Sequence, residues 1–262
     1  MNKRLLVCLL LAALILTACS TSNPKPSLPS TDNPSPTESD TSKAFGKILW
    51  NAYQQGVLPD GTTLDYTGTE AAAQNDFAVF DVDNDGKEEL LLYWTNACMA
   101  GMRTDVFGYN NNEVHHELTV FPSSVFYSNG AVTEDWSHNQ GAAGEGFWPY
   151  SIHLYDAEKD IYTLAGAADA WDRNLIAEGF PSDIDSDGDG MVYFLLPRGE
   201  AWSYTGNRPD YPPVDGEEYE VWRNRFLSGA QKLEIHTQKL TEQNISALGC
   251  PKPEISHPEP LG

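Results

Sequence analysis

The spacing of apolar residues predicts helices near both ends of the folded part of the chain. In residues 43–56 they recur at helical intervals and share one face: Phe45, Ile48, Leu49, Ala52 and Tyr53. Gly56 suits the C-terminus of this helix, because glycine readily adopts the left-handed conformation found there. Residues 215–230, with acids in the first turn, and residues 241–248, opened by Thr241, predict two further helices.

Short apolar runs separated by turn residues predict strands between these helices. Two runs, 77–80 and 89–94, flank an acidic loop, and residues 232–240 form another. Three longer segments each contain two runs around a polar turn: 104–120, 125–136 and 151–167. Asn129–Gly130 is the strongest hairpin signal, because both positions of the tight turn it favours require positive φ.

The predicted fold class is α+β. Strands joined by short turns pair with their sequence neighbours, so we expect a mainly antiparallel β-meander sheet. Helices from the N- and C-terminal segments are expected to pack on this sheet. Residues 44–249 are assigned to a single globular domain, and residues 250–262 to a C-terminal tail.

The first 19 residues have a different pattern. Lys3 and Arg4 precede an apolar run, residues 5–16, that is shorter than the roughly 20 residues of a membrane span. The run ends in LTAC, and the segment resembles a bacterial lipoprotein signal. This resemblance implies removal of residues 1–18 and a lipid on Cys19, which would anchor the protein to the extracytoplasmic face of the cell membrane. An ordinary signal peptide or an uncleaved helical anchor would share the basic and apolar parts of the pattern.

Residues 19–43 are predicted to be the lipidated cysteine and a disordered tether. Serine, threonine and proline make up two thirds of residues 20–43, and such a segment cannot bury enough apolar surface to fold. The full chain has a formal net charge of −22. This charge argues against nucleic acid as a partner, and it leaves the lipid as the contact with an anionic membrane.

The cysteines that remain after Cys8 and Cys19 are Cys98 and Cys250. In an oxidising compartment two such cysteines predict a disulfide, which would pin the C-terminal segment near residue 95. Two free thiols are the alternative.

The sequence DVDNDGKEE, residues 81–89, has the composition of a cation-binding loop. Calcium takes six to eight oxygen ligands at about 2.3–2.6 Å, and acids at alternate positions of a tight loop converge on one centre. The loop resembles the DxDxDGxxD calcium hairpin of the FG-GAP and integrin type, with Glu89 in place of the last aspartate. The resemblance implies Ca²⁺ as the cofactor and these ligands: Asp81, Asp83, Asp85, the carbonyl of Lys87, and Glu89. A solvated acidic turn without an ion is the alternative.

The sequence DIDSDGDG, residues 183–190, repeats this spacing. Its candidate metal ligands are Asp183, Asp185, Asp187 and Asp189, the last through a shifted register. Met191 stands at the ninth position and cannot ligate through oxygen, so this second site is incomplete by sequence.

A third candidate site lies in residues 135–150, where aromatic rings and planar amides gather. Such side chains line sugar-binding grooves, and the candidate ligand-binding residues are Trp136, His138, Asn139, Gln140 and Trp148. A hydrolase that uses His138 and Glu145, or a packed core with no ligand, are the alternatives.

No Walker A loop, dinucleotide fingerprint, HExxH helix or GxSxG elbow is found, so no catalytic residue is assigned. His115 and His116 are expected on opposite faces of a strand, with His116 on the side of Val114 and Leu118 as a core or interface histidine.

As a whole the chain resembles surface lipoproteins of Gram-positive bacteria. The shared features are the lipobox, LPDG at 58–61, the DxDxDG loop at 81–86 and LTEQNI at 240–245. The resemblance implies a location and a calcium loop but no activity. The expected function is a lipid-anchored, extracytoplasmic calcium-binding protein with a structural or ligand-binding role. A carbohydrate-, peptide- or cell-wall-binding protein and a surface hydrolase with structural calcium are the alternatives.

Overall fold

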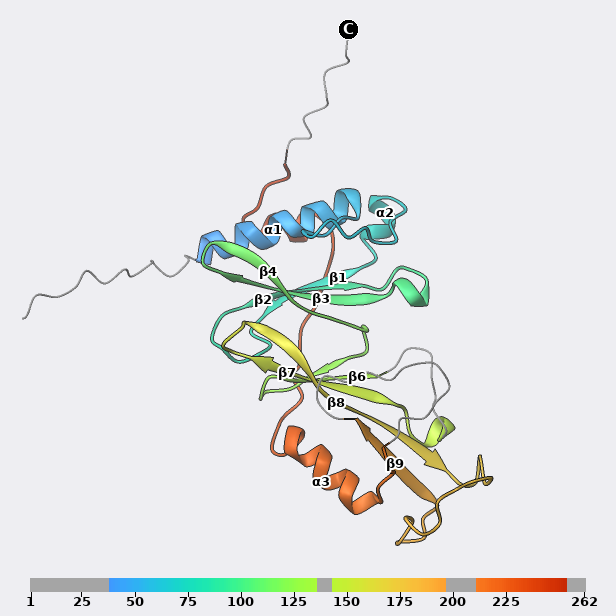
Figure 1. The fold of residues 1–262 in the computed structure, drawn as a ribbon. Coiled ribbons are helices and arrows are strands. Elements are labelled where there is room, and N and C mark those ends of the chain that lie inside the picture. Colours follow the sequence, from blue (N-terminus) through green and yellow to red (C-terminus); the bar gives the residue numbers. More distant parts are fainter. Residues whose placement is uncertain (1–37, 136–142, 197–210, 254–262) are drawn as a thin grey trace, which may run out of the picture. The chain divides into compact units, whose positions relative to one another are not determined.

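The computed structural model describes residues 38–135, 143–196 and 211–253, which form ten strands and four α-helices (Figure 1). The predicted signal peptide, Cys19 and tether residues 20–37 lie outside these ranges. So do the tail beyond residue 253 and four of the candidate ligand-binding residues: Trp136, His138, Asn139 and Gln140. Among the described helices, none is both long and apolar enough to cross a membrane.

The strands form two antiparallel sheets of five strands each, which confirms the α+β class. The first sheet has the order β10–β1–β2–β3–β4, made by Gln238–Lys239, Asp76–Phe80, Glu89–Trp94, Arg103–Asn110 and Glu113–Val120. The second has the order β5–β6–β7–β8–β9, made by Val125–Phe126, Ala131–Asp135, Tyr150–Asp156, Ile161–Asp172 and Met191–Leu196. The expected meander is therefore divided between two sheets, and strand β9 was not predicted.

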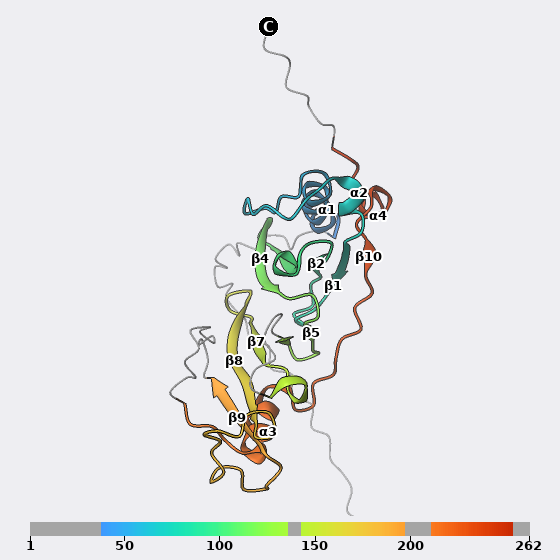
Figure 2. The same cartoon turned by 90° about the vertical axis from the view of Figure 1, so that its right-hand side faces the viewer.

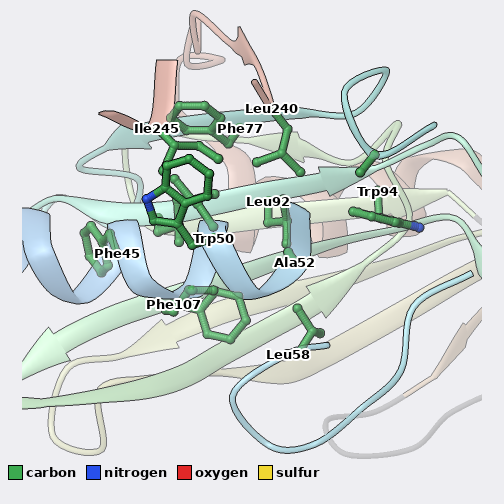
Figure 3. Close-up of a cluster of buried hydrophobic side chains, with 14 of the residues drawn as sticks. Phe45, Trp50, Ala52, Leu58, Phe77, Leu92, Trp94, Phe107, Leu240 and Ile245 are labelled. Carbon is green, nitrogen blue, oxygen red and sulfur yellow. The ribbon is translucent and has the colours of Figure 1, made fainter. Parts of the chain in front are cut away.

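Helix α1, Glu38–Gln55, covers one face of the first sheet together with the short helices α2, Thr69–Ala72, and α4, Glu242–Ala247 (Figures 1 and 2). The predicted face of α1 is buried, and it packs with large apolar side chains of β1, β2 and β3 (Figure 3). Gly56 ends the helix with φ 64°. The helix begins at Glu38, so residues 38–43 are helical rather than part of the predicted disordered tether.

The opposite face of the first sheet packs against the second sheet. Successive residues of a strand point to opposite faces, so Leu90 and Leu92 face α1 while Leu91 joins the shared core. That shared core includes Val132 and Tyr162 from the second sheet. A single apolar core therefore connects the two sheets.

The segment 232–240 crosses from one sheet to the other instead of forming the predicted single strand. Lys232 pairs with Tyr127 next to β5, whereas Gln238 and Lys239 pair with β1. Leu233 and Ile235, between these two ends, pack into the shared core. In Figure 2 this segment runs from α3 to β10.

Helix α3, Gly216–Leu227, packs on the second sheet through aromatic side chains. Tyr219 stacks on Tyr193 of β9 with ring centroids 4.3 Å apart, and its hydroxyl lies 3.0 Å from that of Tyr150 on β7. Asp215 caps the helix by accepting from the Gly216 N–H. Tyr150 is thus a core residue, whereas Trp148 is 39% exposed.

The hairpin predicted around Asn129–Gly130 is present, since β5 pairs with β6 there, but the hairpin with the shorter turn lies at Asn111–Asn112. Asn111 and Asn112 have φ of 51° and 64° and connect β3 to β4, as the two positions of a type I′ turn require. Of the other pair only Gly130 has positive φ. Asn129 instead donates its side-chain amide to the carbonyl of Phe226, 97 residues away.

Both remaining cysteines have free thiols, so the predicted disulfide is absent. Cys98 is exposed and its N–H donates to Asp65. Cys250 packs against Gly46 of α1. The C-terminal segment is instead held to α1 by a hydrogen bond from the indole N–H of Trp50 to the Cys250 carbonyl, 3.0 Å.

Candidate metal centre

The acidic loop, residues 81–89, connects β1 to β2. Its backbone turns through Asn84 and Gly86, whose φ angles are 66° and 89°. Both carboxylate oxygens of Asp81 accept backbone N–H groups of the turn, at 2.8 Å from Asn84 and 3.2 Å from Gly86. Asp83 accepts the N–H of Asp85 at 2.9 Å. These local bonds fold the loop so that oxygens of Asp81, Asp83 and Asp85 lie within 4.8 Å of one another.

Lys87 is exposed, and its ammonium lies 2.7 Å from a carboxylate oxygen of Asp85. Asp85 therefore has a cation beside it already, on the exposed side of the loop. The oxygen that no protein group satisfies lies deeper, on Asp83: its Oδ2 is buried without a hydrogen-bond partner.

Glu89 points back under the loop rather than away from it. Its side chain is buried, and Oε2 accepts the N–H of Val82 at 3.0 Å. This places Glu89 and Asp83 in one cluster with a third buried acid, Glu117 of β4, with oxygens within 4.8 Å of one another. We call Asp83, Glu89 and Glu117 the buried triad.

A β-bulge brings Glu117 into this triad. Val106 pairs with Leu118 and Phe107 pairs with His116, so Glu117 has no partner on β3. A bulge re-aims side chains on the strand that carries it. Leu118 accordingly joins the core between the sheets, while His116 lies against Phe107 with ring centroids 5.3 Å apart.

Because of the bulge, the prediction that Val114, His116 and Leu118 share one face of β4 is wrong for Leu118. His115 and His116 do point to opposite sides, but Leu118 is not on the side of Val114, which packs towards α1. His116 is a structural residue: its Nε2 lies 3.0 Å from Asp105, which is fully buried and also pairs with Arg103.

Because Gly108 of β3 has no side chain, the side chains of Glu117 and His115 can occupy the space beside it. A Cβ at this position would overlap Oε1 of Glu117 and lie 2.7 Å from Nε2 of His115. A glycine inside a strand often marks such a close approach. Glu117 and Gly108 are the residues of this centre that the sequence did not identify, because only the register of β3 and β4 connects them to the loop.

The buried triad gathers negative charge where water is excluded. Burial raises the pKa of Glu89 to about 9 and that of Asp83 to about 7; the charge of Asp83 adds to the shift of Glu89, and the charge of Glu117 adds to both shifts. Burial also raises the pKa of Glu117. Oε2 of Glu117 and the hydroxyl of Tyr162 are buried there without hydrogen-bond partners. Such groups are costly unless a proton or a cation compensates them.

A second cluster adjoins the triad through Glu117. Nε2 of His115 lies 3.2 Å from Oε1 of Glu117 and 3.1 Å from Oδ2 of Asp160, in the turn between β7 and β8. Asp160 also accepts the hydroxyl of Tyr155 and, at 3.2 Å, the amide of Asn110. We call His115, Glu117 and Asp160 the imidazole cluster.

The second acidic loop, residues 183–190, precedes β9 and is assembled differently. Asp185 and Asp187 meet Asp215, the N-cap of α3, with oxygens within 4.8 Å of one another. Asp183 and Asp189 fall outside this group. Arg173 lies 3.4 Å from Asp185, so an arginine already supplies positive charge.

Several buried acidic groups could therefore hold a metal ion. The chain matches no protein-family model, no curated protein and no solved structure.

Proposed function

We propose that the protein is a lipid-anchored, extracytoplasmic domain that binds Ca²⁺ at the acidic loop. The ion is held by Asp81, Asp83, Asp85, the carbonyl of Lys87, and Glu89, and Glu117 of β4 adds a further carboxylate. The observation that carries this proposal is the buried triad with its unpartnered Asp83 Oδ2. A divalent cation would satisfy that oxygen and neutralise the charges that burial penalises.

The ligand chemistry favours calcium over other common ions. Every candidate ligand is an oxygen, most of them from carboxylates, and hard oxygen ligands favour Ca²⁺ or Mg²⁺ over zinc and copper. Oxygens on opposite sides of Ca²⁺ are about 4.6–5.2 Å apart. Oxygens of Asp81, Asp83 and Asp85 lie within 4.8 Å of one another, and so do those of Asp83, Glu89 and Glu117, with Asp83 common to both groups. Mg²⁺ demands a smaller, nearly ideal octahedron and usually retains several bound waters. The buried carboxylates of this centre exclude water, so they favour Ca²⁺ over Mg²⁺.

The bound ion would have a structural role. Asp83 belongs to the β1–β2 loop and Glu117 to β4, so the ion connects two separated parts of the first sheet. The Asp83 backbone also approaches the β5–β6 turn, since a Cβ on Gly130 would lie 3.2 Å from the Asp83 carbonyl. Val82, the next residue, is buried in the core shared by both sheets. Calcium would therefore order the loop where the two sheets meet.

Terbium luminescence and calorimetry test this proposal on the mature chain. Tb³⁺ substitutes for Ca²⁺ at oxygen sites, and Tyr162, which feels the charges of Asp83, Glu89 and Glu117, is a nearby sensitiser. We expect luminescence that Ca²⁺ displaces and that Asp83→Asn abolishes. Asp60→Asn is the matched control, because Asp60 accepts a backbone N–H two residues ahead at 2.8 Å, as Asp83 does, but in an exposed turn outside the acidic loop. Equal luminescence in both variants would refute the calcium site.

The proposed location at the membrane is supported by the lipoprotein-like signal sequence, and a separate experiment tests it. In a bacterial host, labelled palmitate should be incorporated into the wild-type chain and not into Cys19→Ala, which should be released from the membrane fraction. Label that persists in Cys19→Ala, or a wild-type chain without label, would contradict the lipid anchor.

A further inference from the structure

The imidazole cluster is a second place where ligand atoms from separate elements converge. His115 and Glu117 come from β4, and Asp160 comes from the turn between β7 and β8. Their ligand atoms lie within 4.8 Å of one another. Unlike the acidic loop, this group contains a nitrogen ligand, so it offers different chemistry from the calcium centre.

The distances in the cluster match the edges of a metal polyhedron. Nε2 of His115 lies 3.2 Å from Glu117 and 3.1 Å from Asp160. With zinc–nitrogen and zinc–oxygen bonds of about 2.0–2.1 Å, two ligands of a tetrahedral Zn²⁺ are about 3.3 Å apart. The two distances from His115 thus match the spacing that a small dication would impose, and the oxygens of Glu117 and Asp160 lie within 4.8 Å of each other.

One hydrogen bond does not account for this arrangement. An imidazole nitrogen donates at most one hydrogen, yet two carboxylates approach Nε2, at 3.2 Å and 3.1 Å, so a protonated imidazole can donate to only one of them through this nitrogen. Glu117 is 5% exposed, and its other oxygen, Oε2, is unpartnered on the side of the buried triad. Each face of this buried carboxylate is therefore directed at a group of potential metal ligands.

We propose that His115, Glu117 and Asp160 form a site for a transition-metal dication such as Zn²⁺, with Glu117 bridging it to the calcium centre. Imidazole and carboxylate ligands together suit zinc, whereas calcium rarely takes nitrogen. The bridge rests on the proposed calcium site, but the three-residue site does not.

The site is open to solvent on one side. A cavity of about 480 Å³ is lined by His115 and Asp160, and by Asp85 and Lys87 of the acidic loop. Zinc sites that retain a water or an exchangeable ligand have three protein ligands and a fourth coordination position open to solvent. The imidazole cluster has this arrangement. The expected ion therefore exchanges with solvent, rather than being enclosed as in a structural four-ligand site.

Zinc titration of the calcium-loaded mature chain without a histidine tag tests the proposal. We expect isothermal titration calorimetry to give one Zn²⁺ site per chain, weakened by about 100-fold or more in His115→Ala and Asp160→Asn, beyond the 10–100-fold typical of losing a second-shell partner. Asparagine tolerates the positive φ of 58° at Asp160, so this variant keeps the turn. His153→Ala is the matched control, since His153 lies 3.1 Å from one carboxylate, Glu134, on another strand.

Co²⁺ absorption and Tb³⁺ luminescence separate this proposal from the calcium site. The visible spectrum of bound Co²⁺ should change in His115→Ala and not in His153→Ala, while Tb³⁺ luminescence persists in both variants and shows that they fold. Zinc binding that survives His115→Ala, or its absence in the wild-type chain, overturns the proposal even if calcium binds. Zinc binding in a chain that binds no calcium would support it and would refute only the calcium site.

Discussion

Gly108→Ala is the sharpest perturbation of the metal centre, because it changes neither a ligand nor a charge. The added Cβ would overlap Oε1 of Glu117 and lie 2.6 Å and 2.7 Å from ring atoms of His115. Both side chains must move, and flexible side-chain ends can do so without unfolding the sheet. Gly108 does not have positive φ, so alanine meets no backbone strain there.

The expected effect is weaker calcium binding with a nearly unchanged calcium-free protein. Alanine in a strand gains about 0.5–1 kcal/mol over glycine, which offsets part of the rearrangement. If displacement of Glu117 weakens calcium tenfold, ~1.4 kcal/mol is lost. At a calcium concentration of 100 times the wild-type dissociation constant, the ion adds about 2.7 kcal/mol to wild-type stability and about 1.4 kcal/mol to the variant.

Thermal unfolding with calcium and with chelator measures this difference. For a domain of this size the calcium-induced rise in Tm should be about 3–5 °C smaller in Gly108→Ala than in the wild type. Gly146→Ala is the control, because a Cβ there meets nothing within 4 Å. An unchanged calcium-induced rise in a folded Gly108→Ala protein would show that Glu117 takes no part in holding the ion.

Three further predictions concern other parts of the structure. Glu89→Gln removes a buried carboxyl that must take up a proton on folding near pH 7, so it should stabilise the calcium-free protein by about 1–3 kcal/mol and abolish calcium-induced stabilisation; equal chelator sensitivity in variant and wild type would contradict this. Because burial raises the folded-state pKa of Glu89 to about 9, the folded form holds a proton that the unfolded form has released, and calcium-free stability should fall as pH rises from about 5 to 9; denaturant unfolding across this range checks the sign. Asp105→Ala should destabilise the protein by about 3–5 kcal/mol, because it leaves Arg103 without its buried partner; a loss below about 1 kcal/mol would show that this ion pair is not structural.

The sequence identified the features that depend on neighbouring residues. The apolar face of α1, the cap of α4 by Thr241 and the local folding of Asp81–Gly86 all follow from contacts within a few positions. Such contacts are fixed by helical periodicity and by side-chain-to-backbone hydrogen bonds, both of which can be read from the residues alone.

The features that depend on strand register could not be predicted in this way. Glu117 reaches the metal centre only because of a bulge that shifts the pairing of β4 by one residue. Asp215 approaches Asp185 only because α3 begins beside the second acidic loop. The same limit applies to the turn at Asn129. Its side-chain amide donates to the carbonyl of Phe226, and the sequence does not show that this distant carbonyl lies nearby.

The pairing of β10 with β1 has a consequence for the order in which the molecule assembles. Asp76 pairs with Lys239, so the edge of the first sheet is completed by residues made 163 positions later. Until then β1 exposes a row of unpaired backbone groups, and Leu233 and Ile235 are missing from the core between the sheets. The nascent chain therefore stays incompletely folded until residues 233–240 have been made, and closing this long-range contact should be a late and slow step.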